Sequence, residues 1–147
     1  MYLWRISNHF NLDGAGGIYA GGRWHTQGHP IVYCTLNSST SLLEMLVHFN
    51  VDSDRPPRHL HILKIEVPDA CSVEIVKTLP GDWVNNPAST QRLGDLWLTQ
   101  RRSLLLEVPN AIVPETWNVL INPLHSEANL LKIVANYEHA LDPRLLR

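Results

Sequence analysis

Two arginines near the start of the chain stand in surroundings that suit the binding of an anion. Arg5 interrupts the apolar run LWRI, and Arg23 follows Gly21 and Gly22 and precedes Trp24. A guanidinium is costly to bury without a partner, and its planar fork matches a carboxylate or a phosphate. Paired glycines let a backbone approach a ligand closely. Simpler interpretations stay open: Arg5 on an edge strand that meets water, and Arg23 in a solvated turn.

A glutamate and a tyrosine further along are candidates for the lining of a ligand pocket. Glu44 lies in SLLEMLVH, where nearly every neighbour is apolar, and Tyr33 lies in the strand-like run IVYCTL. The segment Ser41-Leu-Leu-Glu44 fits a capping box, which would make Glu44 a structural residue of the first helical turn. The other interpretation points Glu44 into a pocket, toward an arginine or a ribose hydroxyl. Tyr33 would stack on a flat heterocycle such as nicotinamide, or fill the core with its hydroxyl bonded.

Other common chemistries lack their patterns in this chain. The eight histidines show no metal-binding spacing and no HExxH motif, and the two cysteines, Cys34 and Cys71, form no CxxC. The glycine-rich stretch 13–24 is neither a P-loop nor a GxGxxG motif. We therefore expect no bound metal and no tightly held cofactor.

The bulk composition is that of a globular domain. The chain has 147 residues, of which 44% are hydrophobic and 18% are charged, which argues against disorder. A net charge of -2 and a pI of about 6.4 lack the basic footprint of a dedicated nucleic-acid binder. Neither a signal-like amino terminus nor an apolar run of about 20 residues is present, so we expect a reduced cytoplasmic protein without membrane contact.

The candidate residues must be positioned by a mixture of strands and helices. A helix is predicted from near Ser41, a second over 90–100 and a short third over 126–134. Strands outnumber helices and do not alternate with them regularly, so we predict a single α+β domain over 1–147 with mixed sheets. The predicted strands are Tyr2–Ile6, Ile31–Leu36, 60–68, 72–77, 103–109 and 117–123.

The ordered motifs of the chain resemble those of the RES-domain family. LWRI, GGRW, VY, LLEMLVH, VPNAIVP and NVLINPLH follow one another over nearly the whole chain, which closes with DPRLL. The resemblance implies a fold similar to diphtheria-toxin-like ADP-ribosyltransferases. It also implies a toxin of a type II toxin–antitoxin pair that degrades NAD⁺ by phosphorolysis or hydrolysis. Some members of the family ADP-ribosylate a protein instead.

The same resemblance assigns roles to four side chains. The family arginines match Arg5 and Arg23, the family tyrosine matches Tyr33, and the family glutamate matches Glu44. Glu44, Arg23 and Tyr33 are then expected to be catalytic, and Arg5, Arg23 and Tyr33 to bind NAD⁺. The substrate would be consumed, with inorganic phosphate as a potential second substrate.

Two asparagines complete the expected NAD⁺ site. The family serine sits in a VPSA-like segment that here reads VPNA, so Asn110 stands in its place. An amide donates and accepts hydrogen bonds and can replace a positioning hydroxyl, but it replaces a nucleophile poorly. Either the serine only orients other groups, or this chain has altered activity. Asn122 is a further candidate, with a strand-ending turn as the alternative.

The resemblance also predicts the partners. An Xre-type DNA-binding antitoxin would cover the active site, a homodimer within that complex is a further expectation, and the chain itself would bind no nucleic acid. Three alternatives remain: a protein ADP-ribosyltransferase using the same pocket, a decayed module that binds a nucleotide or the antitoxin without turnover, and a nucleic-acid-binding domain. The overall charge argues against the last of these.

Overall fold

One seven-stranded sheet forms the centre of the fold. The computed structural model describes residues 1–49 and 57–146, and its strands lie in the order β4-β5-β6-β2-β1-β3-β7. β4 and β5 are parallel, whereas the other neighbouring strands are antiparallel. The strands are β1 (Tyr2–Ile6), β2 (Val32–Thr35), β3 (His59–Glu66), β4 (Val73–Ile75), β5 (Leu105–Pro109), β6 (Trp117–Ile121) and β7 (Lys132–Ala140).

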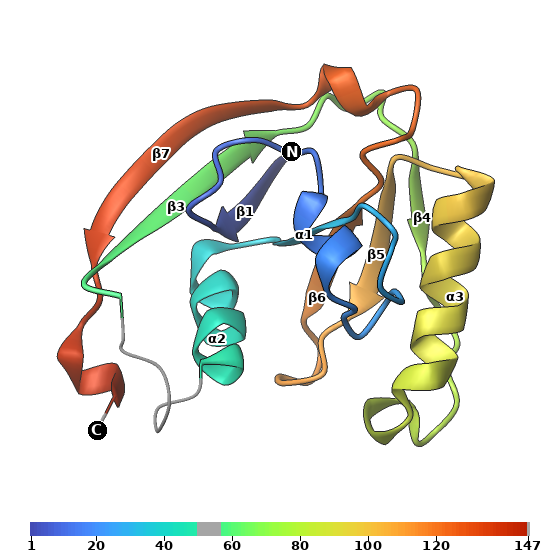
Figure 1. The fold of residues 1–147 in the computed structure, drawn as a ribbon, viewed down its shortest axis with the longest axis horizontal. Coiled ribbons are helices and arrows are strands. Elements are labelled where there is room, and N and C mark those ends of the chain that lie inside the picture. The colour runs from blue at the N-terminus through green and yellow to red at the C-terminus, as the bar shows by residue number, and fades with distance from the viewer. Residues whose placement is uncertain (50–56, 147) are drawn as a thin grey trace.

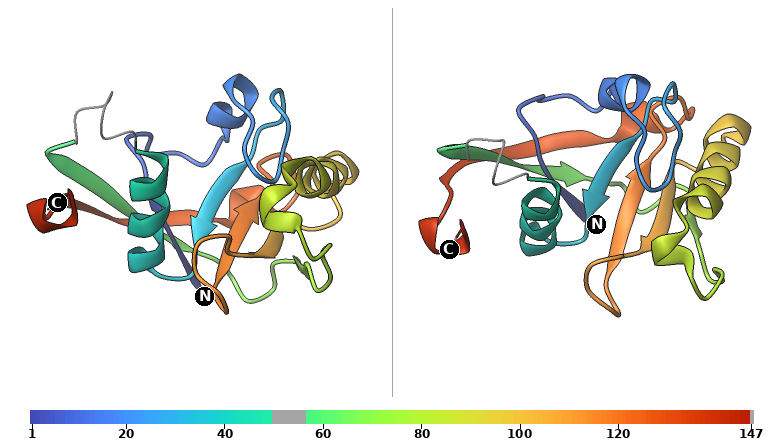
Figure 2. Two further views of the ribbon diagram at one scale, coloured as in Figure 1. Left: turned by 90° about the horizontal axis from the view of Figure 1, so that it is seen from below. Right: turned by 60° about the horizontal axis from the view of Figure 1, so that its bottom comes forward.

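The helices are fewer than the strands and lie around this sheet. β3 and β7 arch over α2 on one side of the molecule, and α3 stands at the other end of the sheet (Figures 1 and 2). The α-helices are α1 (Ala15–Tyr19), α2 (Ser38–His48) and α3 (Pro87–Gln100), with 3-10 turns η1 (Trp83–Asn85), η2 (Ala128–Leu130) and η3 (Pro143–Leu146). The predicted fold class, a single α+β domain with a mixed sheet, is confirmed.

Alternation along the central strands produces a core on each face of the sheet. In β5 and β6, Leu105 and Val119 belong to one buried cluster, and Leu106 and Leu120 belong to the other. Successive side chains of a strand point to opposite faces, so strands covered on both sides read as continuous apolar runs. α3 covers the second face through Trp97, which is fully buried. Among the helices of the described residues, none has the length and apolar character needed to cross a bilayer.

The helix predicted over 126–134 is wrong. Only the short turn η2 forms there, and the chain continues as β7, which pairs with β3 along almost its entire length. The spacing of Leu130, Leu131 and Val134 suits a helix, but the partner strand lies some seventy residues earlier in the chain. Because β propensity depends on the neighbouring strand, such long-range pairing overrides a local pattern.

β1 and β2 are paired near the end of β2 and move apart toward its start. Their ladder consists of the pair Trp4 with Thr35, whereas β1 pairs with β3 along all five of its residues. Arg5 is therefore on a central strand, so the edge-strand alternative is excluded. Beyond Trp4 the two strands diverge, and the side chains there line a cavity.

Candidate functional site

A cavity of about 770 Å³ opens where β1 and β2 diverge. Ligand pockets of proteins typically enclose roughly 300–1,000 Å³, so this volume suits a dinucleotide-sized ligand. β1, β2, α2, β6 and the glycine-rich segment after α1 all contribute to its wall. The chemically active side chains in that wall are Arg5, Arg23, His25, Tyr33, Glu44 and Asn118.

Helix α2 begins earlier than the capping box predicts. Asn37 is its N-cap, and the Asn37 side chain accepts a 2.8 Å hydrogen bond from the Thr40 backbone N–H. The Ser41 hydroxyl instead contacts the Thr35 hydroxyl at 2.6 Å and the Trp4 carbonyl oxygen at 3.1 Å. Glu44 therefore lies past the first turn, and its side chain caps no helix end. The capping-box interpretation is wrong, and the pocket interpretation of Glu44 remains.

Two side-chain amides hold the Glu44 carboxylate. Nδ2 of Asn110 donates to Glu44 Oε1 at 2.9 Å, and Nδ2 of Asn118 donates to the same oxygen at 2.6 Å. Within residues 1–49 and 57–146, Oε2 makes no hydrogen bond to the protein. The protein thus fixes Oε1 of Glu44, and among the described residues Oε2 is left available to a ligand in the cavity.

Arg5 is the uncommitted cation of the cavity. Its side chain is half-buried in the wall, and across the described ranges its guanidinium forms neither a hydrogen bond nor an ion pair with the protein. The neighbouring Cys34 is buried, and burial raises the pKa of its thiol to about 12, although the positive charge of Arg5 opposes that rise. A buried thiol of this kind is a poor nucleophile. As far as the described residues go, Arg5 has its donors available for a ligand anion.

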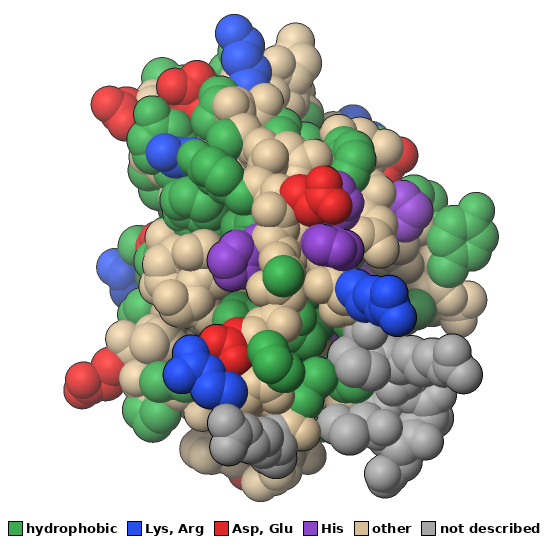
Figure 3. Space-filling model, turned by 90° about the vertical axis from the view of Figure 1, so that its left-hand side faces the viewer, with side chains coloured by type: hydrophobic (Ala, Val, Ile, Leu, Met, Phe, Trp, Pro, Cys, Tyr) green, Lys and Arg blue, Asp and Glu red, His purple; other side chains and the backbone are tan. Residues whose placement is uncertain are grey.

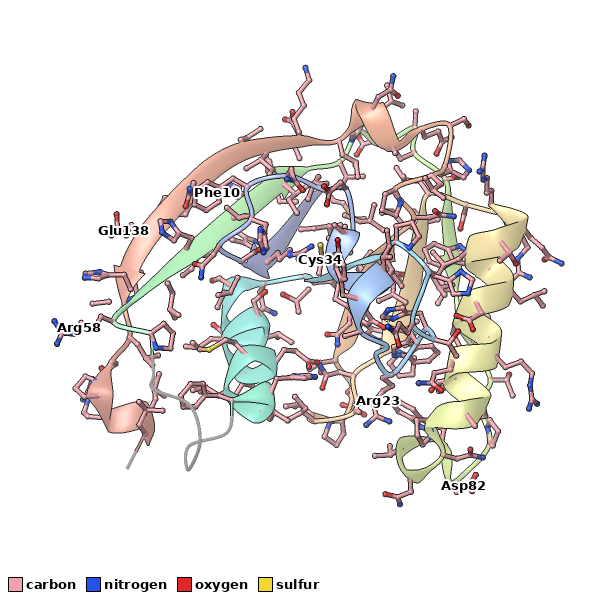
Figure 4. The ribbon with its side chains drawn as sticks, viewed as in Figure 1. Phe10, Arg23, Cys34, Arg58, Asp82 and Glu138 are labelled. Carbon is pink, nitrogen blue, oxygen red and sulfur yellow. The ribbon has the colours of Figure 1, made fainter. Side chains whose placement is uncertain are left out.

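Arg23 is fixed by the turn η1. Nη1 donates to the Val84 carbonyl oxygen at 2.8 Å, and the guanidinium carbon lies 5.8 Å from the centre of the Trp83 ring. Figure 4 shows Arg23 in the region between α2 and α3. The hydroxyl of Thr90 also holds the Arg23 carbonyl oxygen, which ties the segment to α3. Arg23 therefore brings a preoriented fork to the cavity, with part of its donor capacity already used.

The Tyr33 hydroxyl is enclosed by its neighbours. It accepts from the Trp24 backbone N–H at 3.1 Å and lies 2.7 Å from His25 Nδ1. His25 Nε2 faces the carbonyl oxygens of Gly17 and Ala20, which can only accept, so this nitrogen donates to them, and Nδ1 forms the hydrogen bond with the Tyr33 hydroxyl. Burial raises the pKa of Tyr33 well above its usual range. Tyr33 thus offers the cavity its ring and keeps its hydroxyl for the protein.

The two predicted asparagines lie in different places. Asn110 is 6% exposed and sits behind Glu44, which it contacts directly. Asn122 is 1% exposed and lies outside the main cavity, in the wall of a smaller one of about 260 Å³. Its amide donates to the Leu98 carbonyl oxygen and accepts from the Leu124 backbone N–H. The structure therefore brings Asn110 to the other candidates but gives Asn122 the strand-ending role.

His25 and Asn118 are site residues that sequence reasoning missed. His25 lies in the turn after Arg23, and Asn118 lies in an apolar strand, where a single polar residue signals only that one face differs. Their proximity to Tyr33 and Glu44 depends on strand pairing and on the placement of α1, which no local motif encodes. In the described part of the chain, His, Cys, Asp and Glu side chains form no group of three able to hold a metal.

Known proteins match this chain along nearly its whole length. The family model described as "RES domain" matches residues 2–142. A protein of Pseudomonas putida named "Toxin Res" is 41% identical over 133 residues, which cover 90% of this chain and 92% of the relative. A protein of a Sphingobium species named "Prs ADP-ribosylating toxin" is 36% identical over 157 residues, covering 99% and 96%.

A solved structure shares the fold. The M. tuberculosis MbcT–MbcA toxin–antitoxin complex contains a chain that superposes with a TM-score of 0.77 at 17% identity, covering 98% of this chain and 85% of that one. The match of the family model over residues 2–142 and the level of identity to the named toxins agree with the motifs that line the cavity. The chain therefore belongs to the RES-domain toxin family.

Proposed function

We propose that this chain is the toxin of a toxin–antitoxin pair and depletes NAD⁺ by cleaving the bond between nicotinamide and ribose. The observation that carries the proposal is the Glu44 carboxylate, held at one oxygen by two amides in a cavity that also contains the uncommitted Arg5. A fixed carboxylate suits a reaction in which positive charge develops on a sugar.

The chemistry requires little acid catalysis. When the glycosidic C–N bond breaks, its electron pair goes to the pyridinium nitrogen, and nicotinamide leaves as a neutral molecule. Positive charge develops on the ribose, and Glu44 Oε2 would stabilise it, directly or through a ribose hydroxyl. The attraction strengthens where water is excluded. An oxygen of the acceptor then bonds to the anomeric carbon, and the acceptor's proton goes to solvent.

The other side chains would bind and orient the dinucleotide. Arg5 and Arg23 supply two guanidinium groups for the pyrophosphate, one with its donors available and one preoriented by Trp83 and Val84. The Tyr33 ring forms an apolar wall against which the nicotinamide would pack. Orientation of this kind accounts for a large part of the rate enhancement of many enzymes.

The identity of the acceptor defines the activity. Phosphate would yield ADP-ribose-1-phosphate, and water would yield ADP-ribose. A protein side chain is the second candidate acceptor, favoured by the relative from Sphingobium named "Prs ADP-ribosylating toxin", which is 36% identical. All three reactions use the same bond cleavage and the same carboxylate.

The test is NAD⁺ consumption by the purified chain, with and without inorganic phosphate, with products identified by mass. ADP-ribose-1-phosphate formed only with phosphate would assign a phosphorylase, and ADP-ribose in both conditions would assign a glycohydrolase. Label transferred from NAD⁺ to protein would assign the transferase. Folded protein with no turnover in any of these conditions contradicts the proposal and leaves a binding module.

Glu44→Gln tests the role of the carboxylate, because it keeps the shape of the side chain and removes its charge. We expect turnover to fall by roughly 100- to 1,000-fold, the usual effect of removing one electrostatic stabiliser. Wild-type turnover by a folded Glu44→Gln variant would contradict the role of Glu44.

We further propose an antitoxin as the partner, of the Xre DNA-binding type, covering the cavity. The MbcT–MbcA structure is a toxin–antitoxin complex, which supports a protein partner for this fold. We propose one domain over 1–147, a cytoplasmic location consistent with the free thiols of Cys34 and Cys71, and a homodimer inside the complex. On the face that Figure 3 shows, the Lys and Arg side chains are scattered and form no continuous basic patch among the residues described there.

A further inference from the structure

We propose that Asn118 is a positioning residue, which acts through Glu44 and turns the carboxylate so that Oε2 faces the substrate. The inference rests on the proposed function and deepens it, since it names the group that orients the carboxylate. Asn118 Nδ2 donates to Glu44 Oε1 at 2.6 Å, the shorter of the two hydrogen bonds to that oxygen.

The backbone sets the orientation of the Asn110 amide, and Asn110 in turn sets the orientation of the Asn118 amide. Asn110 Oδ1 accepts from the backbone N–H groups of Ile112 and Val113, at 2.7 and 2.9 Å. Its Nδ2 must therefore point the other way, toward Glu44 Oε1 and toward Asn118 Oδ1, which lies 2.9 Å away. Because Asn118 accepts with Oδ1, it donates with Nδ2, and the only charged acceptor within its reach among the described residues is Glu44.

Asn118 belongs to the more rigid support. It lies in β6, where it pairs with Thr35 of β2 on one side and with Val108 of β5 on the other. Asn110 lies in the connection between β5 and β6, where its backbone N–H donates to the Thr116 carbonyl oxygen. A group on a central strand is held more precisely than one on a loop. Asn118 therefore transmits the geometry of the sheet to a carboxylate on α2.

Asn118 should affect the chemical step more than the binding of NAD⁺. Two donors on Oε1 fix the plane and direction of the carboxylate, and Oε2 is left for the ribose. Loss of the Asn118 donor would let the carboxylate rotate without removing its charge or any group that binds the pyrophosphate. A small misplacement of this kind lowers the rate of the chemical step more than it lowers binding.

The first test is the kinetics of Asn118→Ala, and of Asn118→Leu, which retains the side-chain volume. We expect kcat to fall by about 10- to 100-fold with KM for NAD⁺ within about 3-fold of wild type. In a Glu44→Gln background the same substitution should have almost no further effect, because the two residues act as one unit. Asn136→Ala, an exposed amide on β7, is the control and should leave kcat unchanged.

Three results would overturn the inference: an unchanged kcat in both Asn118 variants, a rise in KM without a fall in kcat, or a loss of kcat that is as large in the Glu44→Gln background as in the wild type.

A second experiment does not depend on turnover. In ¹⁵N spectra, the side-chain amide signal of Asn118 should shift on Glu44→Gln substitution and stay unchanged in Asn136→Ala. Folded wild-type protein without NAD⁺ cleavage would end the proposed function, and the amide signals would still decide whether Asn118 holds Glu44.

Discussion

The Tyr33 hydroxyl is held by the protein, so the ring is the part of this residue that a ligand in the cavity would meet. The hydroxyl accepts from the Trp24 backbone N–H and is hydrogen-bonded to Nδ1 of His25, and Nε2 of His25 is hydrogen-bonded to the carbonyl oxygens of Gly17 and Ala20. This chain of hydrogen bonds links β2 to the glycine-rich segment around α1. Because the Tyr33 hydroxyl already takes part in these hydrogen bonds, we do not expect it to transfer a proton in catalysis.

Tyr33→Phe should therefore lower stability more than catalysis. The variant leaves a backbone donor and a buried imidazole nitrogen without their partner, which costs about 1–3 kcal/mol of unfolding free energy. Urea denaturation measures that loss, and the NAD⁺ assay should show kcat within about 5-fold of wild type, because the ring remains. Tyr33→Ala, which removes the ring as well, should raise KM. A folded Tyr33→Phe variant with kcat reduced a hundredfold would show that the hydroxyl takes part.

Among single residues, the sequence identifies candidates better than it assigns their contacts. Arg5 and Glu44 are both recognisable as polar groups in apolar surroundings, and both line the cavity. Asn122 is in a similar strand-ending context to Asn110, yet only Asn110 contacts Glu44. The difference arises from the direction of the chain after each strand, which depends on hydrogen bonds formed in the folded protein.

At the scale of elements, the start of α2 decides the role of Glu44. Asn37, Ser38 and Ser41 are all acceptable N-cap residues by type, and the capping-box pattern favours Ser41. The folded chain uses Asn37, because Ser41 is drawn into hydrogen bonds with Thr35 and Trp4. That choice depends on tertiary contacts and could not be read from the local sequence.

Asn37→Ala should destabilise the protein by about 1 kcal/mol, the usual value of a lost N-cap hydrogen bond. The side chain of Asn37 accepts from the Thr40 backbone N–H, and no other acceptor for this donor is present in the described residues. The measurement is the midpoint of chemical denaturation. Asn37→Asp retains the acceptor and is the control, with stability close to wild type. An unchanged midpoint for Asn37→Ala would contradict the assigned cap.

The contact of Glu127, just before η2, with Ser72, just before β4, predicts that the free energy of unfolding depends on pH. Glu127 accepts from the hydroxyl and the backbone N–H of Ser72, at 2.7 and 2.8 Å. These hydrogen bonds, with a smaller contribution from His125, hold the pKa of Glu127 below its usual 4.5. A lowered pKa in the folded state contributes stability that is present above the usual pKa and is lost as the pH falls through the folded value.

Unfolding midpoints measured from neutral pH down to strongly acid pH test this contribution. Wild type should lose stability below about pH 4.5 more steeply than Glu127→Gln, which has no charge to lose. Glu138→Gln, an exposed carboxylate of β7, is the control and should follow the wild-type curve. Parallel curves for wild type and Glu127→Gln would contradict the linkage.

The strands were easier to predict than the short helices. β1, β2, β5 and β6 lie within predicted ranges, because apolar and β-branched runs bounded by turn residues are strong local signals. α1 is absent from the prediction because two of its five residues, Gly16 and Gly17, and its N-cap residue, Gly14, are glycines. The start of β7 falls in the helix predicted over 126–134 because its partner β3 is distant in the chain. The first difference comes from local composition, and the second comes from a tertiary contact that overrides local preference.

At the scale of the whole molecule, the fold class follows from the sequence but the cavity does not. Counting strands and helices is enough to predict an α+β domain. The cavity requires that β1 diverges from β2 after Trp4 and that β2 diverges from β1 before Thr35, and both strands taken alone look regular. The position of the cavity is therefore a property of the assembled sheet.

Ligand binding should change backbone protection on both sides of this divergence. We expect slower amide hydrogen exchange at residues 5–7 and 31–34 when the Glu44→Gln variant, which turns over slowly, is saturated with NAD⁺. Residues 62–66 of β3, already paired with β1, should change little and serve as the internal control. Protection confined to β3 and β7 would place the ligand elsewhere.

The narrow junction between β1 and β2 is also the place where two parts of the sheet meet. On one side lie β4, β5, β6 and β2, and on the other lie β1, β3 and β7. The pair Trp4 with Thr35, the Ser41 hydroxyl of α2 and one shared buried apolar cluster join the two parts. Glu44 lies on the helix next to this junction, its partner Asn118 lies on β6, and the cavity opens at the same place. A partner protein that covers the cavity would therefore contact both parts of the sheet and bridge the junction between them.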